Sequence, residues 1–252
     1  MTGIGNHERN CFCATPPASA LAAGITWLNG SDSGGECGVP YRARFTMPQR
    51  APDEPWYSFS RGPVAVVVMS TEHDFSAGSV QHEALGRLLR AVDREATPWL
   101  VFAGHRPMYV DSTYFCPSRA PLQALIEPLL LEHDVDLALW GHHHSYHRSC
   151  PMRANATCLA SGGGEHGVVH AVIGAAGYTF SLVAQGADAP AWVAFANDTQ
   201  YGFATIEASD TDLHFQFLRA DDGSAMDEFA LTKPSSAARR GATVTATPAH
   251  EL

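Results

Sequence analysis

Residues 63–70 read PVAVVVMS, a short run of β-branched apolar residues that predicts a strand buried on both faces. Two later runs have the same character, PWLVFAG at residues 98–104 and VDLALW at residues 135–140. Each run is four to eight residues long, which favours strands over helices. The middle of the chain therefore contains three predicted core strands.

Helical patterns separate these strands. Residues 78–94, GSVQHEALGRLLRAVDR, place an apolar stripe on one helix face, formed by Leu85, Leu88, Leu89 and Val92. Residues 120–134, APLQALIEPLLLEHD, predict a second apolar helix that Pro128 bends or ends early. The order β-α-β-α-β predicts an α/β fold, with parallel strands joined by right-handed crossovers and helices packed on the sheet.

The rest of the chain differs in character. Residues 11–60 are rich in Gly, Pro, Ser and Cys, which predicts a long surface excursion held by disulfides. Beyond Gly167 the segments at 168–174, 201–209 and 212–220 predict strands, the last two joined by a hairpin turn near Asp210. The final residues have little apolar surface to bury and predict a disordered tail.

Composition limits the classes of partner. The 252 residues include 16 Lys+Arg against 26 Asp+Glu, a formal net charge of -10, and no basic stripe. Nucleic acid is therefore not expected as a partner. No apolar run approaches the roughly 18 residues of a membrane span. A soluble globular protein is expected.

The cysteines indicate a secreted protein. Six are present without a C-x-x-C pair, so disulfides are favoured over a zinc ribbon or a redox motif. Three N-x-[ST] sequons, at Asn29, Asn155 and Asn197, predict a glycoprotein of the secretory pathway. The first ten residues contain no apolar signal region, so either a signal lies upstream or the protein does not enter the secretory pathway. We predict that Cys150 and Cys158, eight residues apart, close a surface loop as a disulfide.

A histidine-rich segment, WGHHHSYHR at residues 140–148, follows the third predicted strand. Ligands in open α/β sheets gather at the carboxyl ends of strands. If this segment is extended, His142 and His144 point to one side and His143 to the other. The pair would then suit a metal ion. The alternative is a solvated histidine loop that binds metal only adventitiously.

Two shorter segments carry related chemistry. FAGHRPMY at residues 102–109 places His105 after the second strand, where a lone histidine is more often structural than a ligand. GNHE at residues 5–8 offers an Asn6 amide oxygen and an adjacent His7, although Gly-Asn is also common in plain turns. Neither segment decides the function alone.

Together, the three segments resemble the metallophosphoesterase superfamily, and specifically its purple acid phosphatase branch. That family has motifs of the form GNH[DE], a strand ending in His, and GHxH, which match GNHE, AGHRPMY and GHHH in this order. Three further stretches resemble the branch: ECGVPYRARFTMP, STEHDF and VDLALWGHHHSYHRSCP. The resemblance runs from about Gly5 to Leu231.

The resemblance implies a metallophosphoesterase-type αββα sandwich and a binuclear centre of Fe(III) and a divalent Zn, Mn or Fe. It makes Asn6, His105 and His142 ligands of the divalent metal and assigns His144 to Fe(III). His7 would be the proton donor beside a bound phosphate. Arg148 matches a family arginine, but His147 stands where a Glu is usual, which puts the local ion pairing in doubt.

The implied function is acid phosphatase activity on phosphate monoesters, in a secreted or vacuolar protein. Residues 1–160 would form a partial phosphoesterase domain, 161–232 a C-terminal segment and 233–252 a tail. The family's first two motifs, with two Asp and a Tyr ligand, should precede GNHE, where only residues 1–4 stand. We therefore expect this chain to bind at most one metal and to be inactive. The alternatives are a catalytically dead metal- or phosphate-binding module, and a related phosphodiesterase or nucleotide hydrolase.

Overall fold

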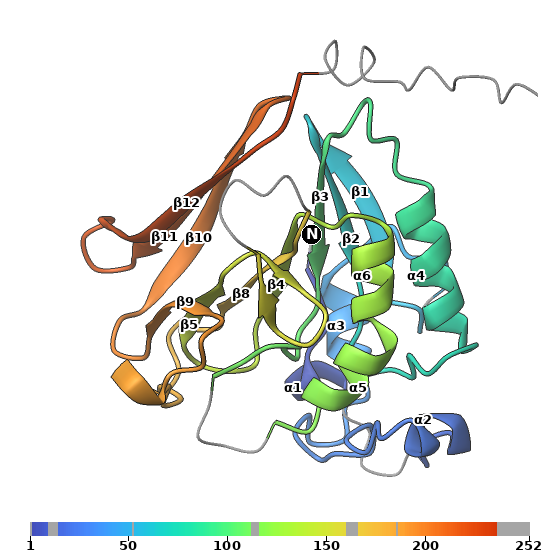
Figure 1. Ribbon diagram of the computed structural model, residues 1–252. Helices are drawn as coiled ribbons and strands as arrows, with labels where there is room; N and C mark the ends of the chain where they lie inside the picture. Colours follow the sequence, from blue (N-terminus) through green and yellow to red (C-terminus); the bar gives the residue numbers. More distant parts are fainter. Residues whose placement is uncertain are drawn as a thin grey trace, which may run out of the picture.

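The fold is built on one seven-stranded sheet (Figure 1). The structure is a computed structural model, and it describes residues 2–9, 15–51, 53–111, 116–159, 166–184 and 186–235. In spatial order its strands are β1 (Tyr57–Arg61), β2 (Val64–Val68), β3 (Trp99–Ala103), β4 (Leu137–Trp140), β8 (Val169–Ile173), β5 (Tyr146–Ser149) and β9 (Val193–Asn197). The predicted core strands β2, β3 and β4 lie side by side. Both pairs are parallel, which confirms the predicted pairing.

Helices cover one face of this sheet. They are α4 (Val80–Arg90), α5 (Arg119–Leu125) and α6 (Glu127–Glu132). The Ser79 hydroxyl accepts a hydrogen bond from the backbone N–H of His82 and caps α4. The second predicted helix is divided at Ile126, and Pro128 occupies the first turn of α6, where its missing N–H costs nothing. The effect predicted for Pro128 is confirmed.

Strand β3 shows why these segments read as continuous apolar runs. Leu100 and Phe102 pack in the core on the helical side of the sheet. Trp99 and Val101 pack in a second core on the other side. Because successive side chains alternate between faces, a strand with two buried faces contains few polar positions.

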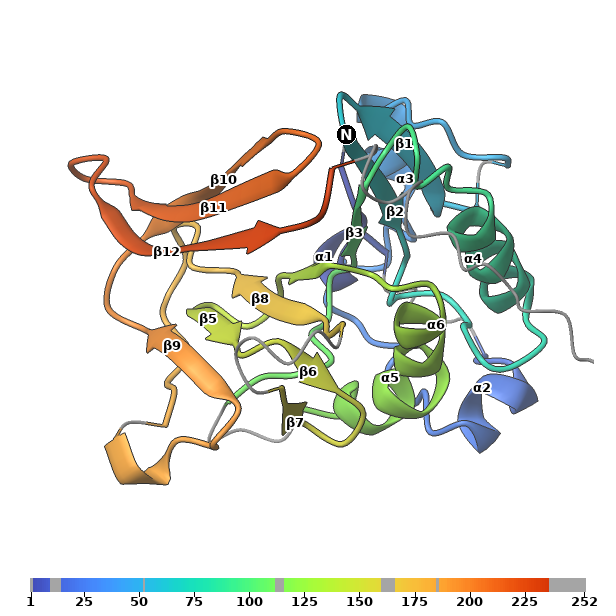
Figure 2. The same ribbon diagram turned by 45° about the horizontal axis from the view of Figure 1, so that its top comes forward.

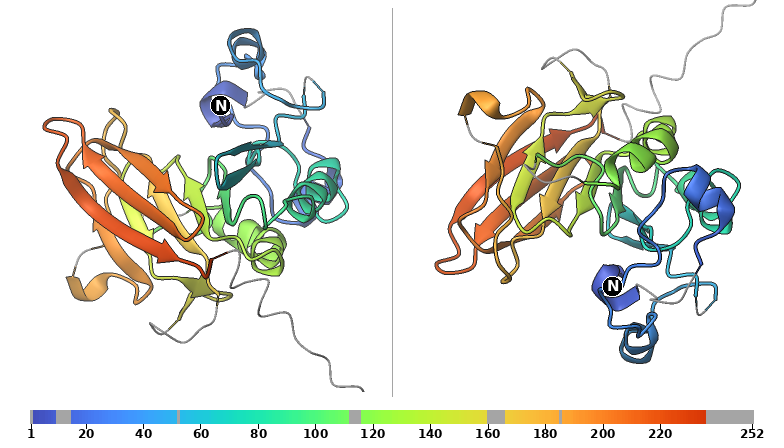
Figure 3. Two further views of the ribbon diagram at one scale, coloured as in Figure 1. Left: turned by 90° about the horizontal axis from the view of Figure 1, so that it is seen from above. Right: turned by 90° about the horizontal axis from the view of Figure 1, so that it is seen from below.

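A three-stranded antiparallel sheet packs over the other face, from β10 (Gly202–Ala208), β11 (Asp212–Arg219) and β12 (Ala225–Thr232). Figures 2 and 3 show the resulting layers of helix, sheet and sheet. Phe215 and Phe217 of β11 fill the space between the sheets, and the Phe217 ring stacks on Tyr146 at 4.0 Å. The predicted hairpin at Asp210 is confirmed, and so is the α/β class.

Some segments differ from the prediction. The expected surface excursion over residues 11–60 includes α2 (Ala18–Ala22), α3 (Val39–Arg44) and most of β1. Ile25 in this region is fully buried. The sequence also fails to predict β5 and β9, which pair antiparallel at one end of the main sheet. The predicted tail lies outside the described residues from 236 onward.

Cysteine pairing is confirmed where it was predicted. Cys150 and Cys158 form a disulfide across the short hairpin of β6 (Met152–Arg153) and β7 (Thr157–Cys158). Cys37 is also disulfide-bonded, whereas Cys116 is a free thiol. In the described part of the chain, no helix is both long and apolar enough to cross a membrane.

Buried histidines should make the fold sensitive to acid. Burial lowers the pKa of His147 and of His170 to about 3. In the unfolded chain both histidines have a pKa of about 6.5. The free energy of unfolding should therefore fall as the pH drops below about 6.5. Each histidine contributes a loss of up to about 1.4 kcal/mol per pH unit, until about pH 3. Both ring nitrogens of His147 lack a hydrogen-bond partner among the described residues, so His147→Leu should flatten this dependence. Urea unfolding at pH 7.5 and 5.0 measures it, with the half-exposed His214→Gln as control. Parallel profiles for His147→Leu and the unmodified chain would contradict the assignment.

Candidate functional site

Three predicted ligands meet at one point. His105 Nε2 lies 2.7 Å from Asn6 Oδ1 and 3.1 Å from His142 Nδ1. The third side of this triangle, from His142 Nδ1 to Asn6 Oδ1, measures 3.2 Å. These atoms come from positions 6, 105 and 142, so only the fold brings them together. We call them the three-donor cluster.

The register of β3 and β4 places the two histidines side by side. The strands are parallel with Ala103 opposite Leu139, and their ladder continues past the last paired residues. Gly104 N–H donates to the Leu139 carbonyl at 3.0 Å, and Gly141 N–H donates to the His105 carbonyl at 2.9 Å. The cluster therefore lies at the carboxyl ends of these strands, as the sequence predicts.

Asn6 comes from a short helix, α1 (Asn6–Arg9), that begins directly beside His105. Gly5 N–H donates to Glu8 Oε2 at 3.0 Å, which anchors the start of this turn. A Cβ at Gly5 would stand 2.8 Å from His105 Cε1, so only glycine allows this approach. Asn6 is 4% exposed, and its amide is held away from bulk water.

The histidine segment is not extended, so the predicted alternation of faces is wrong in its geometry. His142 has φ 64°, which is the left-handed region. The backbone then turns sharply, with hydrogen bonds from His143 N–H to the Gly141 carbonyl at 2.7 Å and from Ser145 N–H to the His143 carbonyl at 2.8 Å. His143 nevertheless points away from the cluster, because its Nδ1 lies 2.7 Å from Ser145 Oγ. The His144 ring packs edge-on against Tyr178, with centroids 5.1 Å apart.

Both histidines of the cluster are neutral at neutral pH. Burial is the main cause that lowers the pKa of His105 well below its usual range, and the neighbouring His142 adds to this effect. Burial and the nearby Arg106 guanidinium lower the pKa of His142 to about 3. Neutral rings retain the lone pairs that a metal ion needs.

A buried ion pair lies behind His142. Arg106 donates from Nε to Glu72 Oε1 and Oε2 at 2.8 and 3.1 Å, and both side chains are buried. Arg106 Nη1 lies 3.3 Å from His142 Nε2. A guanidinium group can only donate hydrogen bonds, so this contact favours a lone pair at Nε2 of His142. If His142 binds a metal through Nδ1, however, its ring proton must be on Nε2. The Arg106 contact therefore opposes metal binding by His142.

The three-donor cluster otherwise suits one divalent ion. With metal–ligand bonds of about 2.0–2.1 Å, neighbouring ligands of a four- to six-coordinate ion lie about 2.9–3.4 Å apart, close to the separations seen. Two imidazoles and an amide oxygen suit zinc-like ions. Within the described ranges, however, no group of three or more His, Cys, Asp or Glu side chains is placed to hold a metal.

His7 lies next to the cluster at the surface. Its Nδ1 is 3.1 Å from the backbone carbonyl of Asp32, which can only accept a hydrogen bond. Nδ1 therefore carries a proton, and Nε2 is the atom left to exchange one with a bound molecule. Asp32 also contacts Asn6, whose Nδ2 donates to Asp32 Oδ2 at 2.8 Å.

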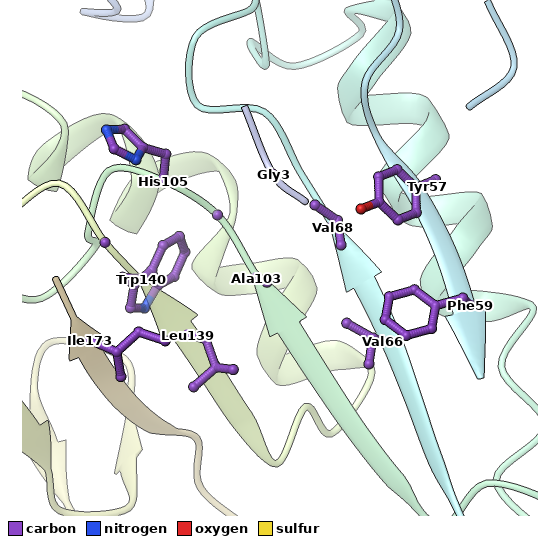
Figure 4. A pocket seen from close by; sticks show the side chains of 12 residues that line it. Gly3, Tyr57, Phe59, Val66, Val68, Ala103, His105, Leu139, Trp140 and Ile173 are labelled. Atoms are coloured by element: carbon purple, nitrogen blue, oxygen red, sulfur yellow. The ribbon is translucent and has the colours of Figure 1, made fainter. Parts of the chain in front are cut away.

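A cavity of about 320 Å³ opens beside His105 on the sheet face opposite the helices. Figure 4 shows His105 beyond the tip of β3, with Trp140 below it and apolar side chains of β1, β2 and β4 along the floor. Tyr57 and Phe59 border the far side. The floor is apolar, so the polar chemistry is confined to the rim at His105.

Two parts of this arrangement escape sequence reasoning. Asp32 and the Glu72–Arg106 pair contact predicted site residues, yet neither has a predicted role. Glu72 lies in STEHDF, a stretch that contributed to the family resemblance, so the sequence did indicate that this stretch belongs near the site. Asp32 lies in a Ser- and Gly-rich loop whose composition indicates only a turn.

Comparison with protein-family models identifies the chain. A model described as calcineurin-like phosphoesterase matches residues 3–146, and one described as iron/zinc purple acid phosphatase-like protein C matches residues 167–228. The chain belongs to the purple acid phosphatase-like branch of the calcineurin-like phosphoesterases. The family that the three motifs predicted is thus confirmed, and the three-donor cluster contains residues from all three of those motifs.

Several relatives share this match. "Probable inactive purple acid phosphatase 27" of Arabidopsis thaliana is 33% identical over 92% of this chain and 37% of its own length. Human "Acid phosphatase type 7" is 29% identical over 77% of this chain and 49% of its own. The solved purple acid phosphatase PPD1 from yellow lupin seeds superposes on all of this chain with a TM-score of 0.79 and 28% identity.

The chain spans 37% of the first relative's length and 43% of the solved lupin chain. In the family that the chain resembles, the first two metal motifs precede GNHE. The relatives are longer than this chain, so they can contain such a preceding segment. Whether this protein carries them, and whether the chain alone is inactive, stay predictions.

Close packing at Gly5 leads to a prediction about the cluster. Gly5→Ala would push the His105 ring away from Asn6, because the added Cβ also meets Glu8 Oε2 at 3.0 Å. Zn²⁺ affinity of the chain should fall by about 10-fold or more, as expected when a ligand is mispositioned. Gly86→Ala in α4 is a matched control, since its Cβ meets nothing within 4 Å. Equal Zn²⁺ affinities for the two variants in competition titrations would refute the close-approach argument.

Proposed function

We propose that this protein is a metal-dependent acid phosphatase acting on phosphate monoesters, and that Asn6, His105 and His142 hold its divalent ion. The observation that carries the proposal is the convergence of Asn6 Oδ1, His105 Nε2 and His142 Nδ1 within 2.7–3.2 Å. These are the residues that family resemblance assigns to one metal. They meet at the sheet edge where α/β enzymes bind their ligands.

Asn6, His105 and His142 would hold a divalent ion there, and the resemblance implies that His144 would belong to an Fe(III) position. Such metals would supply charge neutralisation for the phosphoryl group and an activated water. The residues of the chain act around that chemistry. Neutral His105 and His142 provide ligands at the acidic pH of such enzymes, because their pKa values are lowered. His7, fixed by its Nδ1 contact to Asp32, presents Nε2–H when protonated and donates it to the leaving alkoxide.

The second candidate is a metal- or phosphate-binding module without turnover. It is favoured by relatives named probable inactive purple acid phosphatases and by the absence of a carboxylate-bearing metal group in the described residues. A phosphodiesterase is the third, since a barley relative, 29% identical, is named nucleotide pyrophosphatase/phosphodiesterase.

The 252-residue chain alone is expected to be inactive, so the test uses the protein purified from its natural source. It compares hydrolysis of p-nitrophenyl phosphate and bis-p-nitrophenyl phosphate at pH 5, with Zn²⁺, Mn²⁺ or iron and with a chelator. Chelator-sensitive turnover of the monoester in preference to the diester supports the phosphatase. Phosphate binding by calorimetry without turnover of either compound supports the binding module. Faster cleavage of the diester would replace the monoester assignment.

We also propose that the protein enters the secretory pathway and reaches the cell exterior or a vacuole. The Cys150–Cys158 disulfide is consistent with an oxidising compartment. Two of the three sequons, Asn29 and Asn155, are exposed. Asn197 is partly buried at the end of β9, and its Nδ2, the atom that would carry a glycan, donates to Thr199 Oγ1 at 3.2 Å. Mass mapping of the secreted protein should find glycans at Asn29 and Asn155 and none at Asn197.

A further inference from the structure

We propose that Asp32 is a positioning residue that sets the orientation of both Asn6 and His7. Its carboxylate contacts the Asn6 amide, and its backbone carbonyl contacts the His7 ring. The inference rests on the proposed function, because it concerns the residues that would bind the metal and deliver the proton.

The chemistry of the carboxylate decides how the Asn6 amide is turned. An ionised carboxylate only accepts hydrogen bonds, so it attracts the Nδ2 group, which donates to Asp32 Oδ2 at 2.8 Å. Oδ1 is then left on the opposite side, 2.7 Å from His105 Nε2 and 3.2 Å from His142 Nδ1. Rotating the amide by 180° would place two oxygens against each other and present N–H groups, which cannot bind a metal. Asp32 therefore selects the ligating rotamer.

The backbone carbonyl of Asp32 acts separately on His7. Because it accepts the Nδ1 proton at 3.1 Å, it fixes both the tautomer and the direction of Nε2. A side-chain substitution at Asp32 leaves this carbonyl in place. The two effects can therefore be separated experimentally.

Backbone contacts hold the Asp32 loop against α1. Gly38 N–H donates to the Glu8 carbonyl at 2.7 Å, and Gly34 N–H donates to the Ser31 carbonyl at 2.9 Å inside the loop. Arg42 Nη1 further donates to the Cys37 carbonyl at 3.1 Å. These contacts come from the main chain and from α3, so the loop should keep its place when the Asp32 carboxylate is changed.

Zn²⁺ titration of the 252-residue chain tests the role of the carboxylate. Asp32→Asn keeps the size of the side chain but can present either a donor or an acceptor, so the Asn6 amide is no longer forced one way. We expect Zn²⁺ affinity to fall about 10- to 100-fold, as when an outer partner of a ligand is lost. Asp210→Asn, at the exposed turn before β11, changes charge equally and should leave affinity unchanged. Equal affinities for the Asp32 variant and the unmodified chain would overturn the inference.

A second readout does not depend on metal. In ¹H–¹⁵N spectra of the metal-free chain, the Asn6 side-chain amide should show a downfield, hydrogen-bonded proton that moves upfield in Asp32→Asn. The His7 ¹⁵N pattern of an Nδ1-protonated ring should persist in the same variant. An Asn6 signal that does not respond overturns the inference even if zinc binds. A responding signal in a chain that binds no zinc instead supports the orientation and removes the proposed metal function.

Discussion

His105→Ala and His142→Ala are each expected to weaken Zn²⁺ binding strongly. Loss of an outer hydrogen-bonding partner of a metal ligand lowers affinity about 10- to 100-fold, and loss of a ligand itself should cost more. Each change removes one of only three donors in the cluster, and the remaining two atoms cannot hold the ion alone. Both rings are partly buried and neutral, so their loss also removes a lone pair that water replaces only in part. Calorimetric titration with Zn²⁺ at pH 7 measures the change. In the active protein, phosphatase turnover should fall in parallel.

His143→Ala is the matched control, since this residue is adjacent in sequence yet faces Ser145 and the ring of His147. Its Zn²⁺ affinity should stay near that of the unmodified chain. Because His143 is partly buried, urea unfolding must first show that the variant is folded. Equal losses in all three variants would contradict the assignment of His105 and His142, but not His143, as zinc ligands.

Asp227→Ala is expected to cost about 3–5 kcal/mol of unfolding free energy, the usual penalty for removing one partner of a buried ion pair. Arg148 donates to both Asp227 oxygens, at 2.6 and 2.8 Å, and the Tyr146 hydroxyl donates to Oδ2 at 2.6 Å. These contacts join β5 of the main sheet to β12 of the small sheet. Loss of the carboxylate leaves the Arg148 charge without its partner between the two layers.

Urea denaturation compares Asp227→Ala with Asp221→Ala, which breaks the exposed Arg219–Asp221 pair in the same sheet. The exposed pair should contribute little, because water and salt screen it. A loss below about 1 kcal/mol in Asp227→Ala would show that the two sheets do not depend on this pair. The pairing also answers the doubt raised by His147, because Arg148 finds its acid in β12 instead of at the preceding residue.

The parallel core could be predicted because each of its strands has a simple signal. Strands buried on both faces read as unbroken apolar runs, as at Val64–Val68, and α4 has a clear stripe and a serine cap. The Cys150–Cys158 pairing was predictable because a short polar loop brings its ends together. The three-donor cluster was expected only through the family resemblance of the three motifs. The parallel strands β3 and β4 explain why His105 and His142 meet, but not why Asn6 of α1 joins them.

Other features depend on long-range contacts that have no local pattern. Strand β5, Tyr146–Ser149, overlaps the histidine segment, and its four residues are too few and too polar to show a strand pattern of their own. The left-handed backbone of His142 has no sequence signal, since only a few per cent of residues other than glycine adopt it. Asp32 meets Asn6 only because the loop before α3 folds back on α1. No pattern within that loop shows this contact.

The most direct test of the account is an anomalous difference map at the zinc edge, from crystals of the chain grown with one equivalent of Zn²⁺. The account predicts a single peak at about 2.0–2.2 Å from His105 Nε2, His142 Nδ1 and Asn6 Oδ1. It further predicts that Arg106 Nη1 moves away from His142 Nε2, since that nitrogen must then carry the proton. A peak at His143 and His147, or the absence of any peak within bonding distance of the three-donor cluster, would contradict the central claim.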